Sequence, residues 1–229
     1  IPILTMRSMA EERKNKTDQM LLTYPVSIFK VVGGKFLAMA AVLAIPLAVC
    51  CICPLILYSA GAYGTLSDYA TILAMFCLGC MFISIGMFIS SLTENQIIAA
   101  VGTFVTLLAL YMWDDLLTYL PQTVSANMIG CLIAIIFVAL LLYLMSGSSI
   151  LAMAVALIGA VAVIITYFID SSLFLGLLSN ILGALSVMTV LDNFAFYFVF
   201  DWAGLFLYLS VTALFLFLTV QTVQKRRWH

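Results

Sequence analysis

The run CLIAIIFVALLLYLM, residues 131–145, decides the fold class of this chain. It contains no charged residue, and it does not alternate between apolar and polar positions as a transmembrane β-strand does. With its neighbours it provides the roughly 20 apolar residues that a helix needs to cross a hydrocarbon core about 30 Å thick. The run therefore predicts a membrane-spanning α-helix and not a strand of a barrel.

The composition extends this prediction to the whole chain. Of its 229 residues, 66% are apolar and only 8% are charged, and the mean hydropathy is +1.24. Soluble domains are typically about 45–50% apolar and about 25% charged. We therefore expect an all-α polytopic membrane protein, a single transmembrane domain over residues 1–229, with the lipid bilayer and no nucleic acid among its partners. The first residues, IPILTM, indicate the tail of a helix that begins before Ile1.

Apolar stretches separated by turn-like segments predict six spans. The separators SAGAYGTLSD, SLTENQ, DDLLTYLPQT and SGSS are rich in the small and polar residues of turns. The expected spans are 36–58, 69–91, 95–113, 126–145, 149–169 and 203–224. Two capping boxes, Ser91 with Glu94 and Thr93 with Gln96, predict a helix start near residue 94. Pro46 and Pro54 are expected to kink the first span.

The charges give these spans a common orientation. If residues 7–35 face the cytoplasm, alternate crossings place these basic residues inside: Arg7, Arg13, Lys14, Lys16, Lys30, Lys35, Lys225, Arg226 and Arg227. They place these aspartates outside: Asp68, Asp114, Asp115, Asp170, Asp192 and Asp201. This distribution follows the positive-inside rule, and a seventh span in 171–200 would break it. We therefore expect 171–200 to form interfacial or re-entrant helices on the outer side, and the C-terminus to be cytoplasmic.

Motifs of catalytic and metal chemistry are absent from the sequence. The cysteines lie inside apolar runs and no histidine is near them, so CCIC and CLGC indicate small buried residues and not metal ligands. VVGGKF lacks the spacing of a phosphate-binding loop and has Phe36 where Ser or Thr is required. H-E-x-x-H is absent, and no acid lies in the middle of a predicted span. These observations argue against an ATPase, a zinc peptidase and a proton relay.

One block of charge interrupts this apolar chain. It is SMAEERKNKTDQMLLTYPVS, residues 8–27, which contains six of the nineteen charged residues. Ser8 and Glu11 form a capping-box pattern that predicts a helix from Met9, and Pro25 is expected to end it. We predict a cytoplasmic docking helix over 8–24 that lies along the membrane. The alternative is a solvated loop that carries inside-facing charges.

Three segments resemble a known family. EERKNKTDQMLLTYPVSIFKVVGGKF (11–36), FISSLTENQIIAA (88–100) and YLSVTALFLFLTVQTVQKRRW (208–228) resemble ABC-2 type exporter permeases, in the subgroup of gliding-motility and copper-site-assembly permeases. The resemblance implies a type V exporter-like transmembrane domain in a prokaryotic inner membrane. It also implies that an elbow helix, a first span and most of a second span precede Ile1. Lys16 stands where much of the family has glycine, and 126–169 adds two spans to the family's six-helix plan.

The resemblance also implies partners and site residues. The chain would bind no cofactor itself, and a separate ABC ATPase subunit would bind ATP and Mg²⁺. A second permease copy or a homologous permease would complete a dimer. The ATPase-coupling residues would be Glu11, Glu12, Arg13, Lys14, Lys16, Thr17, Leu21 and Pro25. A helix corner would be formed by Gly33, Gly34 and Lys35, and a cytoplasmic turn by Thr93, Glu94, Asn95 and Gln96. Lys35 and Glu94 are a candidate ion pair, with snorkelling to the headgroups as the alternative.

The expected function is that of a permease subunit of an ATP-driven exporter, without an enzymatic site of its own. The uncharged interior favours a hydrophobic or amphipathic cargo. A non-transporting membrane anchor in a larger ATPase-driven complex is the first alternative, and an intramembrane enzyme is the second. The aromatic residues near 194–202 indicate an interfacial belt in preference to a ligand cage.

Overall fold

The computed structural model contains only α-helices in the part of the chain that it describes. It describes residues 1–15, 27–59, 61, 65–119, 123–146, 153, 156–159, 161, 163, 166–167, 177–183 and 186–226. The helices are α1 (Pro2–Lys14), α3 (Ile28–Cys50), α4 (Ile52–Ser59), α5 (Thr65–Leu92), α6 (Gln96–Tyr111), α7 (Trp113–Thr118), α8 (Val124–Ser146), α10 (Leu177–Gly183), α11 (Met188–Ala195) and α12 (Trp202–Arg226). The predicted all-α fold class is confirmed.

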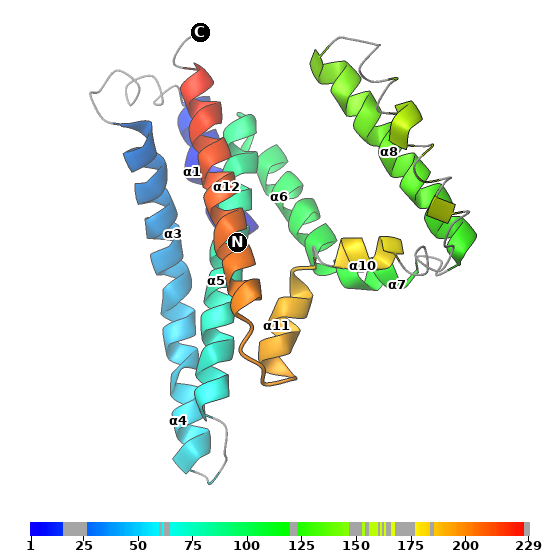
Figure 1. Cartoon of the computed structure of the whole chain (residues 1–229). Helices are drawn as coiled ribbons and strands as arrows, with labels where there is room; N and C mark the ends of the chain where they lie inside the picture. Colours follow the sequence, from blue (N-terminus) through cyan, green and yellow to red (C-terminus); the bar gives the residue numbers. More distant parts are fainter. Residues whose placement is uncertain are drawn as a thin grey trace. The chain divides into compact units, whose positions relative to one another are not determined.

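The chain divides into two compact units, and the larger one contains the longest apolar helices. This unit comprises Ile1–Met112 and Val187–His229. Among the described residues, three stretches are long and apolar enough to cross a membrane: Ile28–Ile56, Leu66–Leu92 and Trp202–Lys225. In Figure 1, α5 and α12 run in the same direction, and α3 runs in the opposite one. The alternate crossings predicted from the sequence give these three helices the same relative directions.

The remaining predicted spans are described to different extents. α6 covers most of 95–113, but with 16 residues it is shorter than the three long stretches. α8, with 23 residues, covers 126–145. Most of the predicted span 149–169 lies outside the described residues.

Two apolar clusters hold the larger unit together. One joins α5, α6, α11 and α12, and its largest fully buried side chains are Tyr208 and Phe194. The Tyr208 hydroxyl donates a hydrogen bond of 2.6 Å to the Val187 carbonyl, which leaves no polar atom of this buried ring without a partner. The other cluster joins α1, α3, α5 and the end of α12 through residues such as Met9, Val32 and Met87. α5 and α12 both contribute to the two clusters, and α5, which packs against α1, α3, α4, α6, α11 and α12, is the central helix of the unit.

The first long span is interrupted near its prolines, as the sequence predicts. α3 ends at Cys50 and α4 begins at Ile52, with Cys51 in a turn between them. Pro54 has no N–H with which to bond the Cys50 carbonyl, and its ring crowds that carbonyl. Pro46 lies inside α3, where the helix continues through it.

The described part of 171–200 contains no helix of span length. α10 has seven residues and α11 has eight. α11 packs closely on α12, since a Cβ atom added at Gly204 would lie 2.8 Å from Cγ2 of Val190. The Thr71 hydroxyl of α5 donates a 3.1 Å hydrogen bond to the Phe194 carbonyl at the end of α11.

The smaller unit comprises Trp113–Ser186. Two long-range hydrogen bonds hold its ends together. The Trp113 indole N–H donates to the Leu182 carbonyl at 2.9 Å, and the Ser186 hydroxyl donates to Asp114 at 2.6 Å. The carboxylate of Asp114 therefore helps to hold the two ends of the smaller unit together.

Candidate functional site

The two ends of the larger unit carry opposite charge. Figure 1 places the end of α1, the start of α3, the turn between α5 and α6 and the end of α12 together. We call this the basic end; its described basic residues are Arg13, Lys14, Lys30, Lys35, Lys225 and Arg226. The start of α5, α11 and the start of α12 lie at the other end, which we call the acidic end. Its described charged residues are Asp68, Asp192 and Asp201.

Helix α1 approaches α5 closely because α5 presents small residues to it. A Cβ atom added at Gly86 would lie 2.9 Å from Cβ of Thr5, and Thr5 is fully buried. One turn further along α5, Ser90 is also fully buried against α1. Small residues four positions apart are a common way for membrane helices to bring their backbones together. This spacing, Gly86 to Ser90, is a sequence signal that could have identified the contact.

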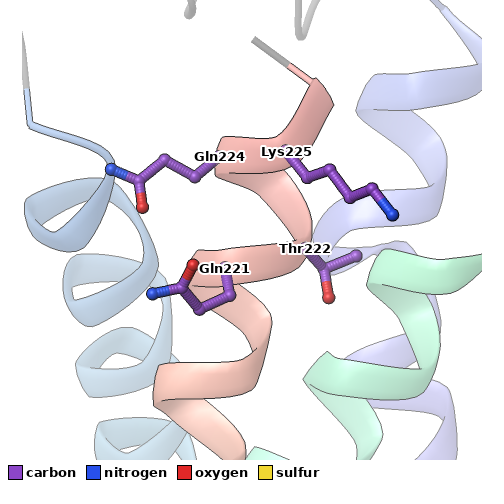
Figure 2. Close-up of a pocket in the computed structure, with 4 residues that line it drawn as sticks. All are labelled: Gln221, Thr222, Gln224 and Lys225. Carbon is purple, nitrogen blue, oxygen red and sulfur yellow. The ribbon is translucent and has the colours of Figure 1, made fainter. Parts of the chain in front are cut away.

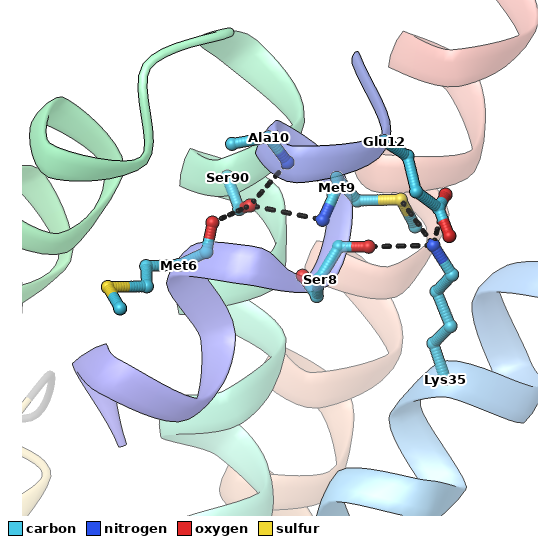
Figure 3. Close-up of polar contacts among 7 residues, drawn as sticks. All are labelled: Met6, Ser8, Met9, Ala10, Glu12, Lys35 and Ser90. Carbon is cyan, nitrogen blue, oxygen red and sulfur yellow. Dashed lines mark hydrogen bonds and ion pairs between the residues drawn. The ribbon is translucent and has the colours of Figure 1, made fainter. Parts of the chain in front are cut away.

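The Ser90 hydroxyl donates one hydrogen bond and accepts two, all with backbone groups of α1 (Figure 3). It donates to the Met6 carbonyl at 3.1 Å. It accepts from the N–H groups of Ala10 at 3.1 Å and Met9 at 3.3 Å. Met6 and Ala10 are the two residues that a regular helix would join to each other, so the hydroxyl is placed within the hydrogen-bond ladder of α1.

Lys35 connects α3 to the end of α1. Figure 3 shows its ammonium group between the Ser8 carbonyl, the Met9 sulfur and the Glu12 carboxylate. The ammonium donates to the Ser8 carbonyl at 2.7 Å, and it forms an ion pair with Glu12. Both side chains of the pair are partly buried, with 22% and 34% of their surface exposed. One cation thus joins two helices through a backbone group and a carboxylate.

Arg13 makes the corresponding connection to the turn between α5 and α6. Its Nη2 lies 3.0 Å from Oε1 of Glu94. Within the turn, the Thr93 hydroxyl accepts from the Asn95 N–H at 3.2 Å, and the Asn95 side chain caps α6 by accepting from the Ile97 N–H at 2.9 Å. The last turn of α1 is therefore connected by ion pairs to both of its neighbours at the basic end.

Several sequence predictions about these residues are wrong in detail. Ser8 does not start a helix, because α1 begins at Pro2 and runs through it; its buried hydroxyl has no hydrogen-bond partner among the described residues. The cap of α6 is Asn95 and neither capping box, since an Asx side chain can bond the N–H two residues on. Lys35 pairs with Glu12 and Glu94 pairs with Arg13, because α1 lies close enough to take both partners.

Gly33 and Gly34 do not form a corner. α3 runs continuously from Ile28 to Cys50 through both of them. Within the part of the chain that the structure describes, a Cβ atom added at either glycine would meet nothing within 4 Å. The other residues expected to couple the ATPase, Lys16, Thr17, Leu21 and Pro25, lie outside the described residues, as does most of the predicted helix 8–24.

The end of α12 offers polar groups on two sides. A hollow of about 410 Å³ is lined by Gln221, Thr222, Gln224 and Lys225. Figure 2 shows Gln221 and Gln224 extending to one side of α12, and Thr222 and Lys225 to the other. This polar surface adds hydrogen-bonding capacity to the basic end.

The acidic end has one carboxylate with a defined structural role. Asp201 caps α12, because its Oδ1 accepts from the Gly204 N–H at 3.0 Å while its Oδ2 accepts from the Asn193 amide at 3.0 Å. These hydrogen bonds, that from Gly204 first, lower the pKa of Asp201 below its ordinary value of 3.8. The charged cap fixes the start of α12 relative to the end of α11.

The side chains of the basic end connect helices to one another. Searched over the described residues, the chain has no group of three or more His, Cys, Asp or Glu placed to hold a metal ion. What the basic end provides is a set of ion pairs and hydrogen bonds that join the last turn of α1 to α3, α5 and α6.

Comparison with known proteins assigns the chain to a family. The family model of ABC-2 family transporter proteins matches residues 2–125, which is more than half of the chain. No curated protein and no solved structure matches the chain. The matched region contains α1, α3, α5 and α6, which meet at the basic end, whereas α12 lies outside it. With its long apolar helices and this match, the chain is a membrane protein that belongs to the ABC-2 family of transporter proteins.

Proposed function

We propose that this chain is the permease subunit of an ATP-driven exporter and that a separate ATPase subunit drives it through the basic end. The observation that carries the proposal is the double ion-pair connection of α1, from Glu12 to Lys35 and from Arg13 to Glu94. A displacement of the end of α1 would act on α3 and on the turn between α5 and α6 at once. Such a connection is what a subunit needs if it is moved from outside by a partner.

The charges of the last turn of α1 divide into two groups with different proposed roles. Glu12 and Arg13 bind other helices of the chain and would transmit movement. Lys14 is exposed and Glu11 is half-buried, and the described residues contain no ion pair of either. We assign Glu11 and Lys14, together with the segment from Lys16 to Pro25, to the surface that contacts the ATPase. Their mixed signs would fix the register of the contact.

The other parts of the proposal follow from family membership. ATP and Mg²⁺ would be bound by the ATPase, and this chain would have no hydrolytic site of its own. A second permease copy or a homologous permease would complete the transporter. The family resemblance supports a prokaryotic cytoplasmic membrane, and the distribution of charge supports an orientation with the basic end and the C-terminus in the cytoplasm. The apolar interior favours a hydrophobic or amphipathic cargo. A non-transporting membrane anchor of an ATPase-driven complex would use the same connection and is the second candidate.

Co-purification with the ATPase tests this proposal. The protein is expressed with its ATPase subunit, and the amount of ATPase retained is compared for the natural chain, the double variant Glu11→Lys/Lys14→Glu and the control Asp68→Asn. We expect the double variant to retain at least several-fold less ATPase and the control to retain all of it. Equal retention by the natural chain and the double variant would refute the assigned contact surface. If the ATPase binds but no lipid, drug or peptide changes its turnover, the anchor function is favoured.

A further inference from the structure

The acidic end of the larger unit contains an apolar cavity that the proposed function does not use. Its volume is about 140 Å³, and it lies between the start of α5 and the segment that follows α11. The lining residues are Leu66, Ser67, Ala70, Phe194, Phe198, Val199 and Phe200. An apolar cavity of about 150 Å³ is large enough to stay dry and bind a benzene ring. This cavity is therefore of a size to take a short length of one hydrocarbon chain.

The wall formed by 198–200 is held in place by an unusual backbone. Phe198 has φ of +53°, a left-handed conformation that bulky residues rarely adopt. Hydrogen bonds hold the segment on both sides of it, from the Tyr197 N–H to the Asp192 carbonyl and from the Val199 N–H to the Asn193 carbonyl at 3.0 Å. A strained residue that its surroundings hold in place often marks a functional site.

The aromatic rings around the cavity form a connected set. Phe194 and Phe200 pack edge to face with their centroids 5.2 Å apart, and Phe200 is 4.7 Å from Trp202. Phe194 is almost completely buried, whereas Phe198 has 66% of its surface exposed and Leu66 has 85%. The cavity thus has a buried floor and an apolar mouth.

The residues around the mouth of the cavity indicate what kind of molecule would enter it. α5 contains one of the stretches long enough to cross the membrane, and Leu66 is the first residue of that stretch. Beyond Leu66, α5 also exposes Leu73 and Met75, and the exposed Tyr197 and Trp202 are residue types enriched where a bilayer meets water. Phospholipid acyl chains are therefore the apolar groups nearest to the opening.

The charges near the cavity indicate which type of lipid headgroup would be favoured there. Each of the three lining segments has an aspartate within two residues: Asp68 after Ser67, Asp192 before Phe194 and Asp201 after Phe200. All the Lys and Arg residues of the larger unit that the structure describes lie in α1, in the first turns of α3 or at the end of α12. A headgroup with a net negative charge would meet these carboxylates without a compensating cation, whereas the ammonium group of an ethanolamine headgroup would meet favourable partners.

We propose that this cavity binds one acyl chain of a phospholipid from the leaflet at the acidic end, and that the site prefers a zwitterionic headgroup such as phosphatidylethanolamine. The acyl chain enters past Leu66 and lies against Phe194 and Phe198. The headgroup stays at the level of Asp68 and Asp201. This site is independent of the ATPase contact, which lies at the basic end.

Photolabelling tests the site directly. The protein is placed in nanodiscs with phosphatidylethanolamine that carries a diazirine at the end of one acyl chain, and the labelled peptides are identified by mass spectrometry. We expect labelling of 194–200 to saturate at a low fraction of the labelled lipid. Labelling of the exposed α3 residues Val42 and Ile45 should rise in proportion to that fraction, because they contact bulk lipid. Proportional labelling of both regions would overturn the proposal.

Two variants and a second lipid complete the test. Ala70→Phe fills the cavity and is expected to reduce the labelling of 194–200 several-fold. Leu66→Asn, at an exposed position, places an uncharged polar group where the acyl chain enters and should have a similar effect, with an unchanged midpoint of thermal unfolding as the control for folding. If neither variant changes the labelling, no chain enters the cavity. Phosphatidylglycerol with the same labelled chain should label 194–200 several-fold less, and equal labelling would overturn the headgroup preference.

Discussion

The guanidinium of Arg13, in the last turn of α1, lies 3.0 Å from the carboxylate of Glu94, in the turn between α5 and α6. In the same turn of α1, Glu12 pairs with Lys35 of α3. Two adjacent residues of opposite charge thus bind α3 and the turn between α5 and α6. A force on the end of α1 would therefore reach both neighbours through short polar contacts.

The Arg13–Glu94 pair is expected to matter more for coupling than for stability. Glu94 has 67% of its side chain exposed, and exposed ion pairs are worth roughly 0–1 kcal/mol. Arg13→Glu should therefore lower the free energy of unfolding only slightly but reduce ATP turnover of the permease–ATPase complex several-fold. The exchange Arg13→Glu/Glu94→Arg should restore turnover. If the exchange does not restore ATP turnover, Arg13 acts through a partner other than Glu94.

Lys35→Met is expected to destabilise the protein. The substitution keeps much of the aliphatic stem but removes the ammonium that bonds the Ser8 carbonyl and leaves the partly buried Glu12 carboxylate without this partner. Loss of such a partner typically costs about 1–3 kcal/mol. The midpoint of thermal unfolding measures the effect, with Lys30→Met as control, because Lys30 is an exposed lysine of the same helix. Equal midpoints for the two variants would contradict the connecting role of Lys35.

Two glycine-to-alanine substitutions should have opposite effects. At Gly86 an added Cβ would meet the buried Thr5 at 2.9 Å from its Cβ, and overpacking of this kind costs about 1–3 kcal/mol. At Gly33 it would meet nothing within 4 Å among the described residues, and alanine favours the helix by roughly 0.5–1 kcal/mol. Thermal unfolding of both variants separates the two cases. Destabilisation by Gly33→Ala would indicate that another subunit packs on that face of α3.

The cap formed by Asp201 should give a stability that depends on pH. Asp201→Ala removes the acceptor for the Gly204 N–H, which costs about 0.5–2 kcal/mol at neutral pH. Because the pKa of Asp201 is lower in the folded state, the stabilisation by its charge is present above the unfolded value near 3.8 and is lost as the pH falls through the folded value. The difference in unfolding free energy between the natural chain and Asp201→Ala should therefore shrink between pH 7 and pH 3. A difference that is constant over this range would show that the charge contributes nothing.

The strained backbone at Phe198 can be measured by comparing two substitutions. Phe198→Gly and Phe198→Ala both remove the ring, but glycine adopts positive φ freely. The glycine variant should be more stable than the alanine variant by about 1–2 kcal/mol, the usual cost of the left-handed conformation. Equal stability would mean that the segment relaxes when the ring is removed.

The sequence predicts the fold class well because the relevant signals are local. Hydropathy and span length locate α5 and α12 closely, and Pro54 predicts the interruption that occurs at Cys51. The prediction of a helix start near Ser8 is wrong, because the capping pattern there has the residue types of a cap but lies inside a longer helix. Tertiary packing against α5 overrides this local preference.

The contacts of the candidate site could be predicted only in part. The family resemblance predicts Glu12, Arg13, Lys35 and Glu94 as site residues, and all four meet at the basic end. Which acid binds which base depends on the rotation and depth of α1 relative to α5, and these are determined by the close approach at Gly86. The spacing of Gly86 and Ser90 indicates that another helix packs closely there, but it does not show which backbone groups the Ser90 hydroxyl will meet.

The most direct test of the central claim is to locate the ATPase on this subunit. A photo-crosslinking amino acid is placed at Lys14, at the basic end, and in a second variant at Asp68, at the acidic end, and each complex with the ATPase is irradiated in membranes. If the ATPase drives the permease through the end of α1, the crosslink to the ATPase forms from position 14 and not from position 68. A crosslink from position 68, or none from position 14 in a complex that hydrolyses ATP, would contradict the account.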